Sequence, residues 1–274
     1  MIVYSCDKMC LSFAGEAILE NINVTINEKD RIGIVGDNGA GKTTFIKVLL
    51  GEYLPTDGNI YMYSKFTSDF GYLPQNAGLE SENKVYDEFL NSFSHLIEEE
   101  NKIAALEESL KNCSQEEAMV FSNKLNVLYD NFVKNEGLTY KSRIESILVG
   151  LGFTKDMWSL NISNLSGGQK TRLALGKIIL KQPKVLILDE PTNHLDADSV
   201  KWLEEEIKAF KGTLLVISHD RCFLDAVTDK TLLIENTGAY LYNAPYTKYI
   251  ELRNHDLAYQ ERCYKQQQRQ IAKI

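Results

Sequence analysis

The sequence has no long hydrophobic run: no apolar stretch approaches the roughly 20 residues that a helix needs to cross a bilayer. It also lacks the basic start, apolar centre and small-residue cleavage site of a secretory signal peptide. Both absences argue against a membrane-spanning or exported chain. We therefore expect a cytoplasmic protein with no membrane partner.

Paired cysteines are missing as well. The chain has five cysteines, an odd number, and they lack the two close pairs that are typical of zinc sites. A disulfide framework would need an even set and an oxidising compartment. We expect free thiols in a reducing environment.

Acidic residues outnumber basic ones except at one end of the chain. The formal net charge is −8, with 30 Lys and Arg against 38 Asp and Glu, but residues 248–274 hold six basic and three acidic side chains. The hydrophobic content of 44% is enough for a large core with a subdomain. We expect an acidic globular body and a basic final helix.

A glycine-rich stretch follows the apolar run at 31–35 and precedes a helical segment that ends at Gly51. It has the GxxxxGK[ST] spacing of a phosphate loop in the required order of strand, loop and helix, which disfavours a chance glycine turn. In such a loop backbone N–H groups hold the phosphates, Lys42 neutralises their charge and the Thr43 hydroxyl ligates Mg²⁺. The candidate nucleotide-binding residues are Gly36, Asp37, Asn38, Gly39, Ala40, Gly41, Lys42, Thr43 and Thr44.

Two adjacent carboxylates follow a second apolar run. Residues 185–188 read VLIL, which is typical of a strand buried on both faces, and Asp189 and Glu190 come directly after it. Two carboxylates at the carboxyl end of a strand predict a site that binds a metal ion and supplies a general base.

A second glycine-rich turn, LSGGQ at 165–169, precedes another segment with apolar residues at helical spacing. Unpaired N–H groups and the positive end of the helix dipole gather at such a position, so the turn is a second candidate phosphate site. Its candidate residues are Ser166, Gly167, Gly168 and Gln169.

Strands alternate with helices over much of the chain, which predicts a parallel α/β sheet that binds ligands at the carboxyl ends of its strands. His219 follows the apolar run at 213–217, where a phosphate contact is favoured over a structural hydrogen bond. Gln75 closes the strand-like stretch FGYLPQ at 70–75 and is a weak signal alone, since any polar residue can end a strand.

The segment between Gln75 and Leu165 has almost no strand signal and several amphipathic helical patterns. Within it, residues 80–136 hold 13 Asp and Glu against five Lys. We expect an inserted helical subdomain that does not lie against phosphates.

Taken in order, these elements resemble an ATP-binding cassette (ABC) domain. GDNGAGKT at 36–43 is similar to the Walker A loop, LSGGQ to the signature and VLILDE at 185–190 to the Walker B strand. The same resemblance identifies Gln75 with the Q-loop and His219 with the switch histidine. The implied fold is α/β: a P-loop NTPase of the ABC ATPase type, with an N-terminal antiparallel β subdomain and an inserted α-helical subdomain.

The resemblance implies Mg²⁺-dependent ATP hydrolysis with ATP and Mg²⁺ as cofactors. It assigns the metal to Thr43, Asp189 and Gln75, the polarisation of the attacking water to Glu190, and a γ-phosphate contact to His219. Phe13 is similar to the aromatic residue that stacks on adenine, although an ordinary core aromatic is an equal alternative. The signature turn would close over ATP bound to an opposing cassette.

Three further features resemble the ABC-F branch, which acts on ribosomes in translation regulation or antibiotic resistance: LSGGQKTRLALGK at 165–177, SHDRCFLD at 218–225, and the charged helix after Tyr249. The resemblance covers nearly all of this chain but half of an ABC-F protein, so we expect an N-terminal fragment. The expected partners are a second cassette, which a homodimer could replace, and the ribosome with its tRNA. The expected domains are an ATPase core at 1–77 and 161–244, a helical arm at 78–160 and the start of a linker helix at 245–274.

Two other functions stay open from the sequence. One is the ATP-binding subunit of an ABC membrane transporter, against which the acidic insertion and the basic final helix argue. The other is a scaffold that holds ATP without turnover, which the presence of Glu190 and His219 disfavours. The basic helix itself could lie against RNA phosphates or pack as a charged coiled-coil arm.

Overall fold

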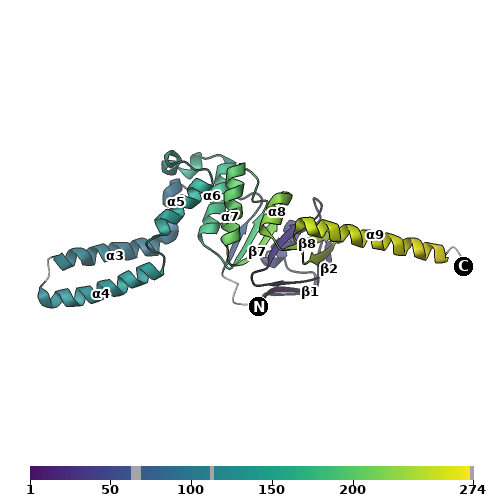
Figure 1. Cartoon of the computed structure of the whole chain (residues 1–274), viewed down its shortest axis with the longest axis horizontal. Coiled ribbons are helices and arrows are strands. Elements are labelled where there is room, and N and C mark those ends of the chain that lie inside the picture. The colour runs from purple at the N-terminus through teal and green to yellow at the C-terminus, as the bar shows by residue number, and fades with distance from the viewer. Residues whose placement is uncertain (63–68, 112–113, 272–274) are drawn as a thin grey trace. The chain divides into compact units, whose positions relative to one another are not determined.

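The computed structural model describes residues 1–62, 69–111 and 114–271. The chain divides into two compact units, one formed by residues 1–76 and 182–274 and the other by residues 77–181 (Figure 1). The first carries both sheets and the second is helical. We call them the sheet unit and the helical unit.

An antiparallel sheet opens the sheet unit. Strands β1 (Ile2–Phe13) and β2 (Glu16–Asn27) form a hairpin, whose turn is made by Ala14 and Gly15 at positive φ. Strand β4 (Asp57–Met62) pairs with the other edge of β1, so the order is β2-β1-β4. The expected antiparallel subdomain is therefore confirmed.

The second sheet has six strands in the order β5-β6-β7-β3-β8-β9, all parallel except β9. The wholly apolar strands lie in its middle because helices and the first sheet cover both of their faces. The strand bounds are β3 (Arg31–Val35), β5 (Phe70–Leu73), β6 (Val185–Asp189), β7 (Thr213–Ile217), β8 (Lys230–Glu235) and β9 (Gly238–Tyr242). The parallel α/β sheet expected from the sequence is present.

One hydrophobic core joins the two sheets. Helix α1 (Lys42–Leu49) lies within it and buries Phe45, Ile46, Val48 and Leu49 among residues of both sheets. Two further helices of this unit are α7 (Ala197–Ala209) and α8 (Arg221–Val227). Because α1 is fixed in the core, the loop before it is held at the carboxyl edge of β3.

Helix α9 (Tyr246–Ile271) has 26 residues and extends from the sheet unit (Figure 1). Its first turn is tied to α8, since Asp225 accepts hydrogen bonds from the backbone N–H and the hydroxyl of Thr247. Tyr249 is buried, and Arg253 pairs with Glu235. Among the described residues, no helix combines the length and the apolar character needed to span a membrane.

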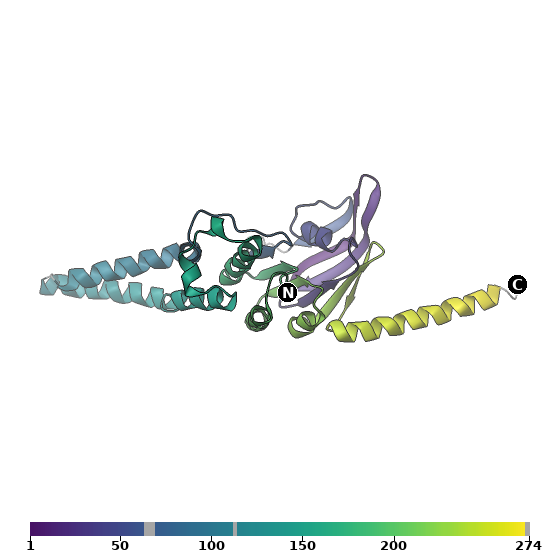
Figure 2. The same ribbon diagram turned by 90° about the horizontal axis from the view of Figure 1, so that it is seen from above.

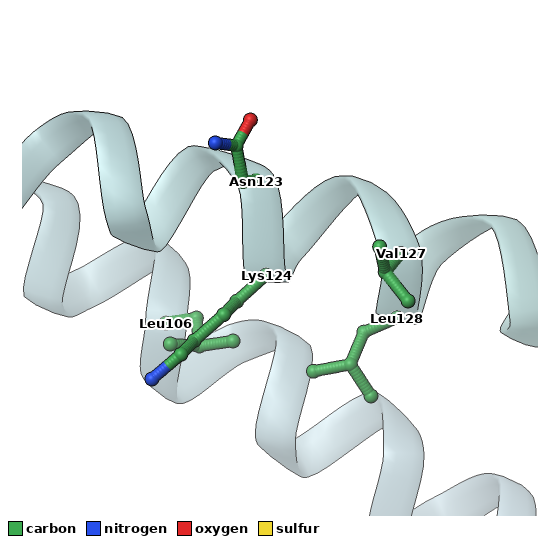
Figure 3. A pocket seen from close by; sticks show the side chains of 5 residues that line it. All are labelled: Leu106, Asn123, Lys124, Val127 and Leu128. Atoms are coloured by element: carbon green, nitrogen blue, oxygen red, sulfur yellow. The ribbon is translucent and has the colours of Figure 1, made fainter.

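The helical unit consists of helices and short 3₁₀ turns. Helices α3 (Ser94–Lys111) and α4 (Gln115–Lys134) run side by side as a long hairpin (Figure 2), which buries Leu96 and Ile103 of α3 and Phe132 of α4. A shallow apolar hollow of about 420 Å³ lies on this hairpin, lined by Leu106, Asn123, Lys124, Val127 and Leu128 (Figure 3). The element bounds are α2 (Val85–Leu90), η2 (Asn91–Phe93), α3 (Ser94–Lys111), α4 (Gln115–Lys134), α5 (Tyr140–Gly150), η3 (Lys155–Ser159), η4 (Ile162–Asn164) and α6 (Gly167–Leu180).

The helical unit is longer than the arm expected at 78–160, because residues 161–181 belong to it. Helix α6 packs on α5 and α2: a Cβ atom at Gly176 would lie 2.7 Å from Leu151 and 3.0 Å from Phe89. This close contact joins residues that are far apart in the sequence. The motif order alone could not show with which unit α6 packs.

Candidate nucleotide site

The loop between β3 and α1 has a backbone that only glycine accommodates. Gly36, Gly39 and Gly41 have φ values of 153°, 80° and 98°. A Cβ atom on Gly36 would lie 2.2 Å from the carbonyl oxygen of Ile234, far inside van der Waals contact. The three glycines let the chain turn sharply and bring bare backbone to the start of α1.

Lys42 lies over this loop. Its Nζ donates hydrogen bonds to the carbonyl oxygens of Gly36 and Asp37, both at 2.8 Å. The N-cap residue of α1 is Gly41, which has no side chain to accept from the first N–H groups of the helix. Those donors, the helix dipole and the ammonium of Lys42 together form a site suited to an anion such as a phosphate.

Thr43 and Asp189 meet beside the loop, although they are 146 positions apart in the sequence. The Thr43 hydroxyl donates to Oδ2 of Asp189 at 2.8 Å, and Asp189 is 2% exposed at the end of β6. Burial raises the pKa of the Asp189 carboxyl, while the Thr43 hydrogen bond and the charge of Lys42 act in the opposite direction.

The Thr43 and Asp189 pair is a donor set of hard oxygens, which suits Mg²⁺. Within the described parts of the chain, no group of three or more His, Cys, Asp or Glu side chains could hold a metal by itself. Mg²⁺ is usually held by one or two protein oxygens together with water and substrate phosphates, so a two-residue set fits this ion.

Glu190 and His219 lie together at the next position along this edge. His219 Nε2 is 3.4 Å from Oε1 of Glu190, and the His219 backbone N–H donates to Oε2 at 3.4 Å. Glu190 is buried, and burial raises the pKa of its carboxyl against the lowering effect of His219. Glu190 also has φ of 54°, an uncommon value for a residue with a side chain and one that concentrates at functional sites.

Sheet register explains why these residues converge. Strands β6 and β7 pair in parallel with Asp189 opposite Ile217, so Glu190 and His219 both emerge just beyond the sheet. The Glu190 N–H donates to the Ile217 carbonyl at 2.9 Å and fixes the turn. Asp220 then caps α8 by accepting from the Phe223 N–H at 3.1 Å.

Gln75 lies at the same edge of the sheet, because its strand also runs parallel to β6. Strand β5 pairs in parallel with β6, with Leu73 opposite Leu188, and Gln75 is exposed in the turn that follows β5. The sheet unit therefore gathers the phosphate loop, Asp189, Glu190, His219 and Gln75 at one sheet edge.

The signature turn belongs to the helical unit and begins α6. Ser166 and Gln169 form a capping box: the Gln169 N–H donates to the Ser166 hydroxyl at 3.3 Å, and the Ser166 N–H donates to Oε1 of Gln169 at 2.9 Å. A Cβ atom on Gly167 would meet nothing within 4 Å. The turn therefore presents Gly167 to open space.

Phe13 is not a core residue, so the core alternative considered from the sequence is wrong. Its side chain is 44% exposed because it stands at the end of β1, past the covered part of the sheet. The ring meets Tyr53 edge-on with centroids 5.1 Å apart, and Lys47 Nζ lies 5.4 Å from the Tyr53 centroid. Sequence reasoning missed Tyr53, because it bears no motif and reaches Phe13 only through the fold.

The family described as ABC transporter matches residues 19–193. The protein YdiF of Bacillus subtilis (strain 168) is 37% identical over the whole chain, which covers 42% of YdiF. Tylosin resistance ATP-binding protein TlrC of Streptomyces fradiae is 32% identical over 85% of the chain and 42% of its own length. ABC transporter F family member 5 of Arabidopsis thaliana is 27% identical over 95% of the chain and 38% of its own length.

A solved structure described as "Structure of ATP binding subunit of ABC transporter" is similar in fold, with a TM-score of 0.63 and 18% identity. The match covers 88% of this chain and 90% of that structure. The curated relatives are much longer: the chain spans less than half the length of each of the three named above.

Proposed function

The chain belongs to the ABC transporter family, and from this premise we propose that it is a Mg²⁺-dependent ATPase cassette of the ABC-F type that acts on the ribosome. The ABC-F resemblance found in the sequence is confirmed, and one of the relatives carries the F family name. Hydrolysis with Mg²⁺ and ribosome action are the proposal.

The observation that carries the ATPase proposal is the edge of the parallel sheet where Lys42, the Thr43–Asp189 pair and the Glu190–His219 pair meet. Phosphoryl transfer requires mainly positioning and charge neutralisation, and these residues supply both. Bound Mg²⁺ would contribute a positive charge on the phosphate oxygens, held by Thr43 and Asp189. Gln75 is proposed to contact the metal and the attacking water from the end of β5.

The protein groups have distinct proposed roles. Lys42 and the N–H groups of the loop hold the phosphates of ATP, and Thr44 continues this cradle into α1. Glu190 accepts the proton of the attacking water, for which a raised pKa makes its carboxylate a stronger base. His219 lies against Glu190, where it orients that carboxylate and contacts the γ-phosphate. Phe13 offers an exposed ring on which adenine can stack.

A second cassette is part of the proposal, because one ATP needs one phosphate loop and the signature turn is then an additional anion site. Ser166, Gly167, Gly168 and the N–H groups at the start of α6 would contact the nucleotide held by the other cassette. That cassette is either a second domain of a longer protein or a second copy of this chain. We propose that residues 245–274 begin a helix that joins two cassettes.

Ribosome action rests on the ABC-F resemblance and on the relative named for tylosin resistance. It would place the protein in the cytoplasm, with tRNA and ribosomal RNA as neighbours. The competing candidate is a transporter's ATP-binding subunit, which is how the solved structure of similar fold is described.

ATP chemistry is tested with Lys42→Ala and Glu190→Gln in this chain. We expect Lys42→Ala to weaken binding of a fluorescent ATP analogue about 10-fold to 100-fold, since a hydrogen bond to a charged group contributes about 1.5–3 kcal/mol. Glu190→Gln should bind ATP but not hydrolyse it, and should sediment as an ATP-dependent dimer. Equal titrations for wild type and Lys42→Ala would contradict the site, and a Glu190→Gln monomer at high concentration would contradict the homodimer.

The partner is tested with the complete reading frame carrying Glu190→Gln, mixed with ribosomes and with membrane vesicles. We expect the protein to pellet with ribosomes when ATP is present and to be released as the salt concentration rises. The same protein with Lys42→Ala is the control that should not pellet. Association with membranes in place of ribosomes would replace the ribosome proposal by the transporter function.

A further inference from the structure

Phe13 stands at the turn end of the β1–β2 hairpin, and this end of the hairpin lies against the phosphate loop. Phe13 pairs with Glu16 across the hairpin, and Ile18 follows two residues later on β2. A Cβ atom built on Gly41 of the loop would lie 3.2 Å from the Ile18 side chain, so hairpin and loop are in close contact. The ring that is proposed to stack on adenine is therefore near the loop that is proposed to hold the phosphates.

Tyr53 lies on a short segment that is fixed at both ends. On one side, the Tyr53 backbone N–H donates to the carbonyl oxygen of Lys47 in α1 at 3.3 Å. On the other side, the N–H and the hydroxyl of Thr56 both donate to the carbonyl oxygen of Cys10 in β1, at 2.8 and 3.1 Å. The segment is thus a bridge from the helix that follows the phosphate loop to the strand that ends at Phe13.

The ring of Tyr53 supports the ring of Phe13 by direct contact. The two ring centroids are 5.1 Å apart and the ring planes meet at 75°, an edge-to-face pair that is more stable than the buried area alone explains. The Tyr53 ring is itself half-buried against the hydrophobic core, and Lys47 Nζ lies 5.4 Å from its centroid. Phe13, in contrast, is 44% exposed. An anchored ring therefore holds an exposed one.

We propose that Tyr53 is a positioning residue for the nucleotide base, which holds the Phe13 ring in one orientation so that its exposed surface receives adenine. A side chain that is free to change rotamer loses that freedom on binding, at a cost in affinity, and a side chain already held in place avoids the cost. This inference rests on the proposed ATP function and on the stacking role of Phe13. It adds to them a residue outside the motifs.

The test variants are Tyr53→Leu and, in parallel, Tyr53→Met, which fill the site without a ring; using both keeps the test independent of the folding of either. Calorimetric titration measures the affinity of this chain for Mg²⁺–ATP and for inorganic tripolyphosphate, which has no base. We expect the ATP affinity to fall about 2-fold to 10-fold, the range set by the contribution of one aromatic pair. The tripolyphosphate affinity should stay at the wild-type value, which also shows that the variants are folded.

The matched control is Tyr53→Phe, which keeps the ring and removes the hydroxyl. We expect it to bind both ligands with wild-type affinity, because the edge-to-face contact needs only the ring. A loss of ATP affinity in Tyr53→Phe as large as that in Tyr53→Leu would overturn the inference, since the hydroxyl would then be the group that matters.

A double-mutant cycle with Phe13→Leu separates positioning from direct contact with the nucleotide. If Tyr53 acts by holding Phe13, then Tyr53→Leu should cause no further loss of ATP affinity once Phe13 is replaced. Equal losses in the presence and absence of the Phe13 ring would show that Tyr53 acts by another route, and the inference would be wrong.

The remaining outcomes distinguish a failure of this inference from a failure of the proposed function. If folded Tyr53→Leu binds ATP like wild type, or loses ATP and tripolyphosphate affinity equally, Tyr53 does not position the base, while the ATP site stands. If Phe13→Leu itself binds ATP like wild type, the proposed stacking of adenine on Phe13 fails, and the role of Tyr53 fails with it. The phosphate site is tested separately by the Lys42→Ala titration.

Discussion

The two glycine-rich turns of this chain, residues 36–41 before α1 and residues 165–168 at the start of α6, are built differently. In the first, three glycines at positive φ shape the backbone and the N-cap residue is itself a glycine. In the second, Ser166 is in an extended conformation and closes a capping box with Gln169. One turn is held by backbone geometry and the other by side chains.

The difference teaches that glycine content alone does not define a phosphate site. At the phosphate loop the close approach of the Ile234 carbonyl makes glycine obligatory, and Lys42 and Asp189 supply charge nearby. At the signature turn Ser166 already satisfies one of the helix N–H groups, and no acidic residue stands in the first turn of α6. The signature turn has donors but no catalytic side chains of its own, which agrees with a role on a nucleotide held elsewhere.

The largest expected difference between the two turns is in stability, and it is measured by replacing one glycine of each turn with alanine. Gly36→Ala should lower the free energy of unfolding by about 3 kcal/mol, because the new Cβ would lie 2.2 Å from a backbone oxygen at a φ that side chains avoid. Gly167→Ala should change it by less than about 0.5 kcal/mol, since its Cβ meets nothing within 4 Å. Urea unfolding of both variants is the measurement. If the two variants lose similar amounts of unfolding free energy, the backbone of the first turn does not require glycine more than that of the second.

An intermediate effect is expected from removing the cap of the signature turn. Ser166→Ala should cost about 1 kcal/mol, the usual contribution of a side-chain N-cap. Hydrogen exchange of amides at the start of α6 should accelerate, whereas amides of α1 should not change. Ser163→Ala, at an exposed position of the preceding turn, is the control. If Ser166→Ala exchanges like that control, the capping box does not hold the turn.

The smallest expected effect concerns pH and the buried carboxylate beside the phosphate loop. Because the pKa of Asp189 is raised in the folded chain, the folded state binds more protons than the unfolded state between the two pKa values. The contribution of Asp189 to stability therefore falls as pH rises above about 4, the ordinary pKa of aspartate. Asp189→Asn lacks this loss, so its stability relative to wild type should increase from pH 4 to pH 7.

Thermal unfolding in a pH series, without nucleotide, measures this dependence. Asp156→Asn, in an exposed 3₁₀ turn of the helical unit, serves as the control and should follow wild type. If the stability difference between Asp189→Asn and wild type does not vary with pH, burial does not raise the pKa of the Asp189 carboxyl.

Much of the sheet unit could be predicted from local sequence. A short apolar run such as Leu214–Ile217 favours a buried strand of a covered parallel sheet, and the structure has strand β7 at Thr213–Ile217. The phosphate loop could be located because its glycines and Lys42 are close together in the sequence. Strand β1 (Ile2–Phe13) is less visible in the sequence, since exposed residues such as Asp7 and Lys8 interrupt its apolar pattern.

By itself, then, the sequence determined the order of the elements, the helix starts and the glycine-shaped loop, because these depend on neighbours along the chain. The tertiary structure alone decided that Phe13 is exposed, that α6 packs within the helical unit, and that the Asp189 carboxylate is buried. The burial and the electrostatic environment of a side chain depend on many residues that are distant in sequence. The hydrogen bond between Thr43 and Asp189, which are 146 positions apart, is an example. These contacts form only when the chain folds.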